Sequence, residues 1–158
     1  MFTETPVNEL LLYRVSNLLL QPSYVSLESA LSYYHFIPEG VYSMQAISTV
    51  KTISYTTPAG NFNYHSVKPA YFFGYAVVYA DWLPVRIAQP EKAILDYLYL
   101  NSKLNRLEDF AALRFNTSAI NETINWEKLD LYLKVFDSNT LSKRTRLFKK
   151  MQLHAALK

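Results

Sequence analysis

The chain has 158 residues, of which half are hydrophobic and 18% are charged, and its formal net charge is +3. This composition predicts a folded domain with a hydrophobic core and argues against intrinsic disorder. The absence of cysteine excludes disulfides and any zinc or redox site built on cysteine. No secretory signal is visible, and the uncharged stretch near the middle at residues 69–80 is too short to span a membrane. We therefore expect one cytoplasmic domain over residues 1–158, with no membrane partner.

The aromatic content is unusual, with 13 tyrosines and nine phenylalanines. Aromatic rings bury a large area, but a buried tyrosine also needs a hydrogen-bond partner for its hydroxyl. We expect a tyrosine-rich core whose hydroxyls reach its edges. A surface that binds a protein or nucleic acid is the alternative.

The first third of the chain predicts two helices. Over residues 8–20 the apolar residues are spaced like one face of a helix. This face consists of Leu11, Leu12, Val15, Leu18 and Leu19. The Gln21-Pro22 pair ends this helix. A second helix follows with Ser26 as its N-cap, and it ends at residues 38–40.

The middle of the chain predicts strands. Residues 41–50 favour a strand. Within residues 51–57, Ile53, Tyr55 and Thr57 alternate on one face, and Phe62 and Tyr64 alternate after a turn of sequence TPAG, which predicts a hairpin. A second hairpin is expected from residues 75–79 and 85–88, with its turn at residues 81–84.

From Pro90 onward the sequence predicts helices. Pro90 suits a first helical position, and Glu91 beside it complements the helix dipole. Further helices are expected over residues 107–113, 126–136 and 140–157. The predicted fold class is therefore α+β, with N-terminal helices, a small, mostly antiparallel sheet with hairpins, and a C-terminal helical set.

No pattern typical of a cofactor or covalent catalytic site is present. The three glycines are too far apart to form a phosphate-binding loop: Gly40, Gly60 and Gly74. The nucleophile elbow is absent as well. The histidines lie on different predicted elements without metal-ligand spacing: His35, His65 and His154. We expect no cofactor, no metal and no enzymatic activity.

Three charged residues near Pro90 resemble part of a nuclease site. Restriction-type nucleases use an acid-x-Lys pair and another carboxylate, and the acids hold a metal ion that activates water. Here Glu91 and Lys92 are adjacent, however, and Lys92 and Asp96 have ordinary i,i+4 ion-pair spacing. We interpret them as a charged helix start with an ion pair. A metal-dependent nuclease and a contact with a partner remain as alternatives.

Positive charge is concentrated in the predicted final helix. Residues 138–158 contain six basic residues and no acidic one, and five of the six lie within eight positions: Lys143, Arg144, Arg146, Lys149 and Lys150. Such a cluster can meet successive phosphates of DNA or RNA, with salt-dependent affinity and no base reading. A solvated helix face and a site for an acidic partner are the alternatives.

Five segments, taken in order, resemble a known family. They are SYVSLESALSYY (residues 23–34), IPEGVY (37–42), AGNFNYHSVKP (59–69), FFGY (72–75) and IAQPEKAILDYL (87–98). Together they resemble the AbiEi antitoxin family of abortive-infection and type IV toxin–antitoxin systems. The resemblance extends from about Leu11 to the end of the chain.

The resemblance implies an antitoxin function. Members of the family counteract a cognate toxin with a nucleotidyltransferase fold, the AbiEii partner, and many also act as transcriptional regulators that repress their own operon. The type IV label implies that neutralisation need not involve direct contact with the toxin. Glu91, Lys92 and Asp96 fall on a recurrent family motif, for which the resemblance gives no role beyond fixing their helix.

The sequence departs from the family pattern at its N-terminus. The family typically begins with a DNA-reading winged helix-turn-helix, whereas barely ten residues precede the first matching helix here. We therefore expect antitoxin action without sequence-specific operator reading by such a domain. The alternative is a nucleic-acid-binding regulatory module that uses the basic final helix.

Overall fold

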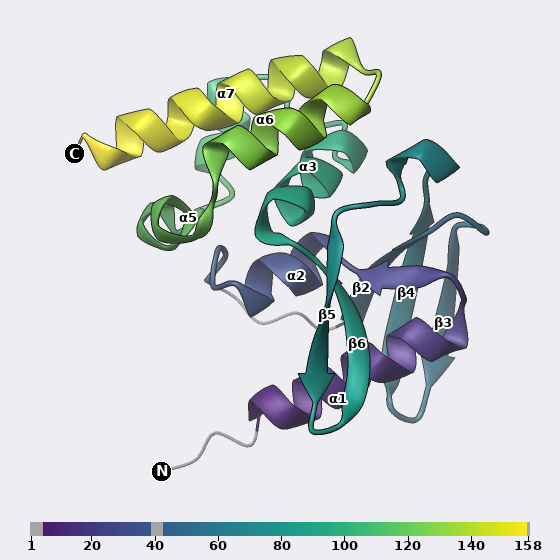
Figure 1. Ribbon diagram of the computed structural model, residues 1–158. Helices are drawn as coiled ribbons and strands as arrows, with labels where there is room; N and C mark the ends of the chain where they lie inside the picture. Colours follow the sequence, from purple (N-terminus) through teal and green to yellow (C-terminus); the bar gives the residue numbers. More distant parts are fainter. Residues whose placement is uncertain (1–4, 39–42, 158) are drawn as a thin grey trace.

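The computed structural model describes residues 5–38 and 43–157 (Figure 1). The helices in these ranges are α1 (Thr5–Leu19), α2 (Leu27–Tyr33), α3 (Pro90–Leu100), α4 (Leu107–Ala111), α5 (Thr117–Thr123), α6 (Trp126–Val135) and α7 (Asn139–Ala156), with a 3-10 turn η1 (Pro69–Tyr71). The strands are β1 (Ser23–Val25), β2 (Ser43–Ser48), β3 (Ile53–Thr57), β4 (Gly60–Ser66), β5 (Tyr75–Ala80) and β6 (Leu83–Ala88). The predicted break near residues 39–40 and the start of the strand predicted over residues 41–50 lie outside the described residues.

The strands form one mixed sheet in the order β3-β4-β2-β1-β6-β5. The pairs β3–β4, β2–β1 and β6–β5 are antiparallel, and the pairs β4–β2 and β1–β6 are parallel. The short strand β1, which the sequence does not predict, lies inside the sheet. It meets β6 only through the register pair Val25 and Ile87. Most of β6 therefore has a neighbouring strand on one side only.

Both predicted hairpins are confirmed. In the first, Thr57 pairs with Gly60 across the turn between β3 and β4. In the second, Ala80 pairs with Leu83, so the turn contains only two residues and is tighter than predicted. Its first residue, Asp81, has a φ of 57°, a left-handed conformation that Asp adopts more readily than most residues.

The helices surround the sheet in two groups, which confirms the predicted α+β class. Figure 1 shows α3, α5, α6 and α7 together at one end of the molecule, and α1 lies against the strands at the other end. Helix α1 packs on β1, β2, β5 and β6, whereas α2 packs on β2 and α3. Helix α3 contacts both α6 and α7, so it connects the sheet with the C-terminal helices.

The predicted first helix is confirmed as α1, but its apolar residues differ in burial. Leu11, Leu18 and Leu19 are 38%, 49% and 40% exposed, whereas Ser16 and Asn17 are buried. The side-chain amide of Asn17 accepts a hydrogen bond from the N–H of Arg86 at 2.7 Å and donates to its C=O at 3.2 Å. Helix α1 thus hydrogen-bonds to the backbone of β6 beside the short pairing of β6 with β1.

Tyrosines contribute strongly to the core, as expected, and their hydroxyls bond to backbone carbonyls. Tyr13 donates to the C=O of Ser29 at 3.1 Å, and Tyr34 donates to the C=O of Ala88 at 2.6 Å. Buried tyrosines can therefore join elements that are distant in sequence without leaving a polar atom unsatisfied.

Candidate functional site

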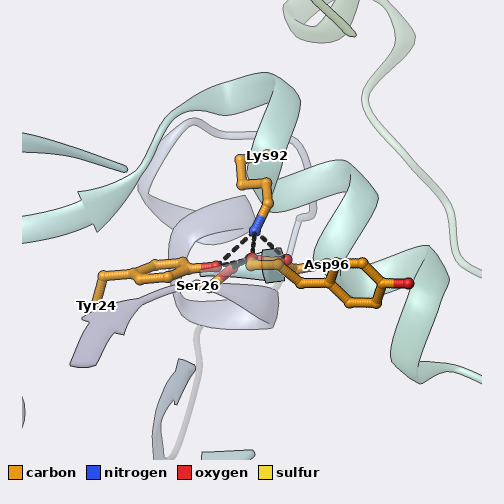
Figure 2. Close-up of polar contacts among 5 residues, drawn as sticks. Tyr24, Ser26, Lys92 and Asp96 are labelled. Atoms are coloured by element: carbon orange, nitrogen blue, oxygen red, sulfur yellow. Dashed lines mark hydrogen bonds and ion pairs between the residues drawn. The ribbon is translucent and has the colours of Figure 1, made fainter. Parts of the chain in front are cut away.

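Lys92 and Asp96 form a buried ion pair on α3 (Figure 2). Because they are one helical turn apart, both side chains lie on the same face of the helix. Lys92 Nζ lies 2.8 Å from Asp96 Oδ1, and the two side chains are 0% and 1% exposed. The predicted i,i+4 pair is confirmed, but it lies in the interior.

Tyr24 and Ser26 complete the hydrogen bonding of this pair (Figure 2). Lys92 Nζ also donates to the hydroxyl of Tyr24 at 2.7 Å and to the C=O of Tyr71 at 2.8 Å, so all three ammonium protons have acceptors. Asp96 Oδ2 accepts from Tyr24 at 2.9 Å and from Ser26 at 2.7 Å. The pair is thus fully hydrogen-bonded, as a buried ion pair must be to be tolerated.

Aromatic rings surround the ammonium group. Lys92 Nζ lies 5.2, 4.5 and 5.2 Å from the ring centres of Tyr24, Phe73 and Phe136. Burial lowers the pKa of Lys92, and Asp96 opposes this shift. Burial likewise raises the pKa of Asp96, and Lys92 opposes that shift. Removal of either residue would leave the other in an apolar site without its partner.

Gly74 allows the chain to pass close to Lys92. A Cβ atom at this position would lie 3.0 Å from Lys92 Cγ and 3.1 Å from Tyr132 Cε2. Gly74 also has a φ of 75°, which favours glycine. Any larger residue would press on the buried ion pair.

Some of the five sequence segments named above meet at this cluster. Three of the five contribute to it: residues 23–34 supply Tyr24 and Ser26, residues 72–75 supply Phe73 and Gly74, and residues 87–98 supply Lys92 and Asp96. The sequence predicts Ser26 only as an N-cap. Ser26 does precede α2 but makes no side-chain capping bond, because its hydroxyl donates to Asp96. Its true partner is 70 residues away.

Glu91 has different partners from Asp96. Its Oε2 accepts the backbone N–H of Asn125 at 2.8 Å, and its Oε1 lies 3.5 Å from Lys128 Nζ. Asn125 caps the N-terminus of α6, where its side chain accepts from the N–H of Lys128. Glu91 is 3% exposed and therefore joins the start of α3 to the start of α6.

The partners of Glu91, Lys92 and Asp96 all lie inside the protein, so these residues make contacts that stabilise the fold. Glu91 and Asp96 are engaged in separate interactions inside the protein, and neither is exposed for binding from solvent. Over the described ranges, no group of three or more His, Asp or Glu side chains could hold a metal ion. The cluster is suited to joining β1, η1 and α3.

The structure divides the predicted basic cluster on α7 into two groups. Arg144 is 8% exposed and donates through Nη1 to the C=O groups of Leu98 and Tyr99, at 2.9 and 3.2 Å, so it satisfies the C-terminal end of α3. Lys149 forms an ion pair with Asp130 on α6. These two side chains have partners within the protein.

The other three basic residues remain on the surface. Lys143, Arg146 and Lys150 are exposed. Their spacing of three and four positions places them on one face of α7. This basic face, defined by Lys143, Arg146 and Lys150, is the part of the predicted nucleic-acid site that is accessible to a ligand.

No protein-family model matches the sequence, and no curated protein is significantly similar to it. Over residues 5–38 and 43–157, no helix combines the length and apolar character needed to cross a membrane.

Proposed function

We propose that this chain is the antitoxin domain of a type IV toxin–antitoxin or abortive-infection system, and that it acts in the cytoplasm against a nucleotidyltransferase-like toxin. The proposal rests on the five AbiEi-like segments. The observation that carries it is the convergence of three of these segments on the cluster of Lys92 and Asp96.

In this proposal the chain has no catalytic site of its own. The charged motif of α3 holds the fold together, and neutralisation depends on exposed surfaces. Direct contact with the toxin and an indirect effect on its product or target both fit this interpretation.

Growth rescue tests the proposal. A cognate nucleotidyltransferase-like toxin is expressed with the chain or alone, with an inactive toxin as the control for expression load. We expect survival only when the chain accompanies the active toxin. Failure of rescue with both proteins soluble contradicts the proposal for this chain. Rescue that appears only after an N-terminal winged helix is added would show that this domain is required.

The basic face of α7 favours a second candidate, a nucleic-acid-binding regulatory module. Lys143, Arg146 and Lys150 can meet neighbouring phosphates, and residues 138–157 contain no acidic side chain to oppose them. By binding DNA in this way, the module would contribute to autoregulation of its operon. Phosphate contacts alone would give little sequence preference.

Charge reversal tests this second candidate. The combined variant Lys143→Glu, Arg146→Glu and Lys150→Glu should lose DNA or RNA binding in a gel shift. The loss of three phosphate contacts should also reduce the slope of log affinity against log salt by about 2–3. The matched control reverses three exposed lysines elsewhere, Lys51, Lys68 and Lys103. Equal effects of the two variants would mean that only net charge matters and that α7 is not the site.

A further inference from the structure

The strand β5 ends the sheet and carries no charge. It is the last strand in the order β3-β4-β2-β1-β6-β5, and its sequence is YAVVYA. Edge strands in soluble proteins usually carry charges, proline or bulges, because their unpaired backbone groups otherwise bind other strands. No such residue lies within β5, and the side chains of Val77 and Tyr79 are 48% and 63% exposed.

The hydrogen bonds to β6 determine which residues of β5 face outward. In an antiparallel pair, successive residues alternate between bonding to the neighbour and pointing away from it. The two-residue turn is closed by Ala80 and Leu83, and at the other end Gln89 donates to the C=O of Gly74 at 2.9 Å. Even-numbered positions therefore bond to β6. The N–H and C=O groups of residues 75, 77 and 79 point to the outer edge.

At the other edge of the β5–β6 hairpin, along β6, side chains hydrogen-bond to outward-facing backbone groups. On β6, the alternation directs residues 84, 86 and 88 toward β1, which pairs with β6 only around Ile87. Side chains supply further partners for this edge. Arg14 donates to the C=O of Pro84 at 3.0 Å, Tyr34 donates to the C=O of Ala88, and Asn17 bonds both backbone groups of Arg86.

The outer edge of β5 has no such arrangement. Within the described part of the chain, nothing hydrogen-bonds to the outward backbone groups of Tyr75, Val77 and Tyr79. The other edge strand of the sheet, β3, differs in its side chains, because its exposed residues are the polar Ser54 and Thr56. Of the two edge strands, β5 therefore combines an open backbone edge with exposed apolar side chains.

We propose that β5 pairs antiparallel with β5 of a second copy of this chain, which joins the two sheets across a two-fold axis at Val77. In this register Val77 faces Val77 of the second copy, and Tyr75 faces Tyr79 of the second copy in both directions. All of these residues present outward backbone groups, so three hydrogen-bonding pairs form without a bulge. Aromatic and β-branched pairs of this kind stabilise antiparallel sheets.

The observations favour a second copy over an unrelated strand because β5 is complementary to itself. The residues around Val77 read Tyr-Ala-Val-Val-Tyr, so an aromatic residue lies two positions away on each side. No charge within β5 would meet a like charge across the axis. The paired surface is short compared with a standard interface of about 1,600 Å², so we expect a dimer with a dissociation constant of micromolar order.

A single engineered cysteine tests the register, since the natural chain has none. Val77→Cys places two thiols on opposite sides of the axis with Cα atoms about 5.5 Å apart, which suits a disulfide. Under mild oxidation we expect a cross-linked dimer for Val77→Cys. Thr56→Cys, at the matching outward position of β3, and Val78→Cys, on the other face of β5, should remain largely uncross-linked.

Analytical ultracentrifugation tests the association itself. The unmodified chain should sediment as a monomer–dimer mixture at about 100 μM, and Val77→Lys should shift it to monomer because two like charges meet on the axis. Thr56→Lys is the matched control and should leave the mixture unchanged. A monomeric unmodified chain at this concentration would overturn the proposal. Loss of the dimer in Thr56→Lys but not in Val77→Lys would overturn it as well. A dimer that Val77→Cys cannot cross-link would contradict the register.

Discussion

Two groups of charged residues on α3 and α7 end in opposite environments. Glu91, Lys92 and Asp96 on α3 are at most 3% exposed, whereas the basic face of α7 is open to solvent. The packing of the two helices explains this difference in exposure. Helix α3 contacts β6, α2, α6 and α7, so its charged side chains are enclosed, whereas α7 packs against other helices and leaves one side free.

This difference separates charge that stabilises the fold from charge that can bind a partner. A buried charge must have its own counter-charge and hydrogen bonds, so its removal affects stability. An exposed charge contributes little to stability but remains free to attract a polyanion. Variants on α3 should therefore change the free energy of unfolding, and variants on the basic face should change binding.

The largest effect is expected for Asp96→Ala. The substitution leaves Lys92 buried without its counter-charge, and we expect a loss of about 3–5 kcal/mol in the free energy of unfolding. Urea denaturation measures it. Asp130→Ala, which removes an exposed carboxylate paired with Lys149, should cost less than about 1 kcal/mol.

A double variant sharpens this result. Lys92→Met combined with Asp96→Leu removes both charges together, so it should be less destabilising than Asp96→Ala alone. If Asp96→Ala costs no more than Asp130→Ala, the pair does not have the structural role assigned to it.

A smaller loss is expected for Gly74→Ala. The added Cβ would press on Lys92 Cγ and Tyr132 Cε2 while occupying a left-handed conformation, with an expected cost of roughly 2–4 kcal/mol. Gly60→Ala is the control, since Gly60 also has a positive φ but nothing lies within 4 Å of the place that an added methyl group would occupy. Thermal or urea unfolding should show the greater loss at Gly74; an equal loss at Gly60 would contradict the role given to the contacts with Lys92 and Tyr132.

Arg144 and Arg146 provide the same comparison within one helix. Arg144→Met removes hydrogen bonds from a buried guanidinium to the end of α3 and should cost about 1.5–3 kcal/mol. Arg146→Met changes an exposed residue and should stay within about 0.5 kcal/mol. Urea denaturation of both variants measures the difference. Similar values would contradict the division of the basic cluster into buried and exposed residues.

Local signals in the sequence were sufficient for many elements. Pro90 marked the start of α3, and the TPAG turn marked the hairpin of β3 and β4. These signals act through neighbouring residues and do not depend on the rest of the fold. Elements without such signals were missed. Strand β1 has only three residues, all buried, and so shows no alternation, while α5 is mostly polar and begins at an Asn116 cap that was overlooked.

The candidate site was predictable only in part. The i,i+4 spacing of Lys92 and Asp96 predicted their ion pair, because helix geometry alone brings them together. Their burial depends on Tyr24 and Ser26, which are about 70 residues away in the sequence, and on the close approach of Gly74. No periodic pattern reports such distant contacts. The same limit explains why Arg144 could not be distinguished from Arg146 before the fold was known.

His65 is less buried than the charged residues of α3 and less exposed than the basic face of α7. Its substitution should have the smallest effect on the free energy of unfolding. Its side chain is half-buried on β4, and its Nε2 lies 3.1 Å from Gln45 Oε1. Burial lowers the pKa of His65 below 6.5, and Glu28 opposes this shift. Below pH 6.5 the unfolded chain therefore binds a proton more readily than the folded chain, so stability falls as the pH drops toward the folded pKa.

His65→Gln should reduce this pH dependence, because glutamine does not titrate. We expect the loss of unfolding free energy between about pH 7.5 and about pH 5.5, measured by urea denaturation, to be smaller in the variant than in the unmodified chain. Well above about pH 6.5 the histidine is neutral in both states and should add no slope. An identical loss in both proteins would show that the carboxylates account for the whole acid response. A larger loss in the variant would mean that the folded environment favours the protonated ring, so that the charge of Glu28 outweighs the effect of burial.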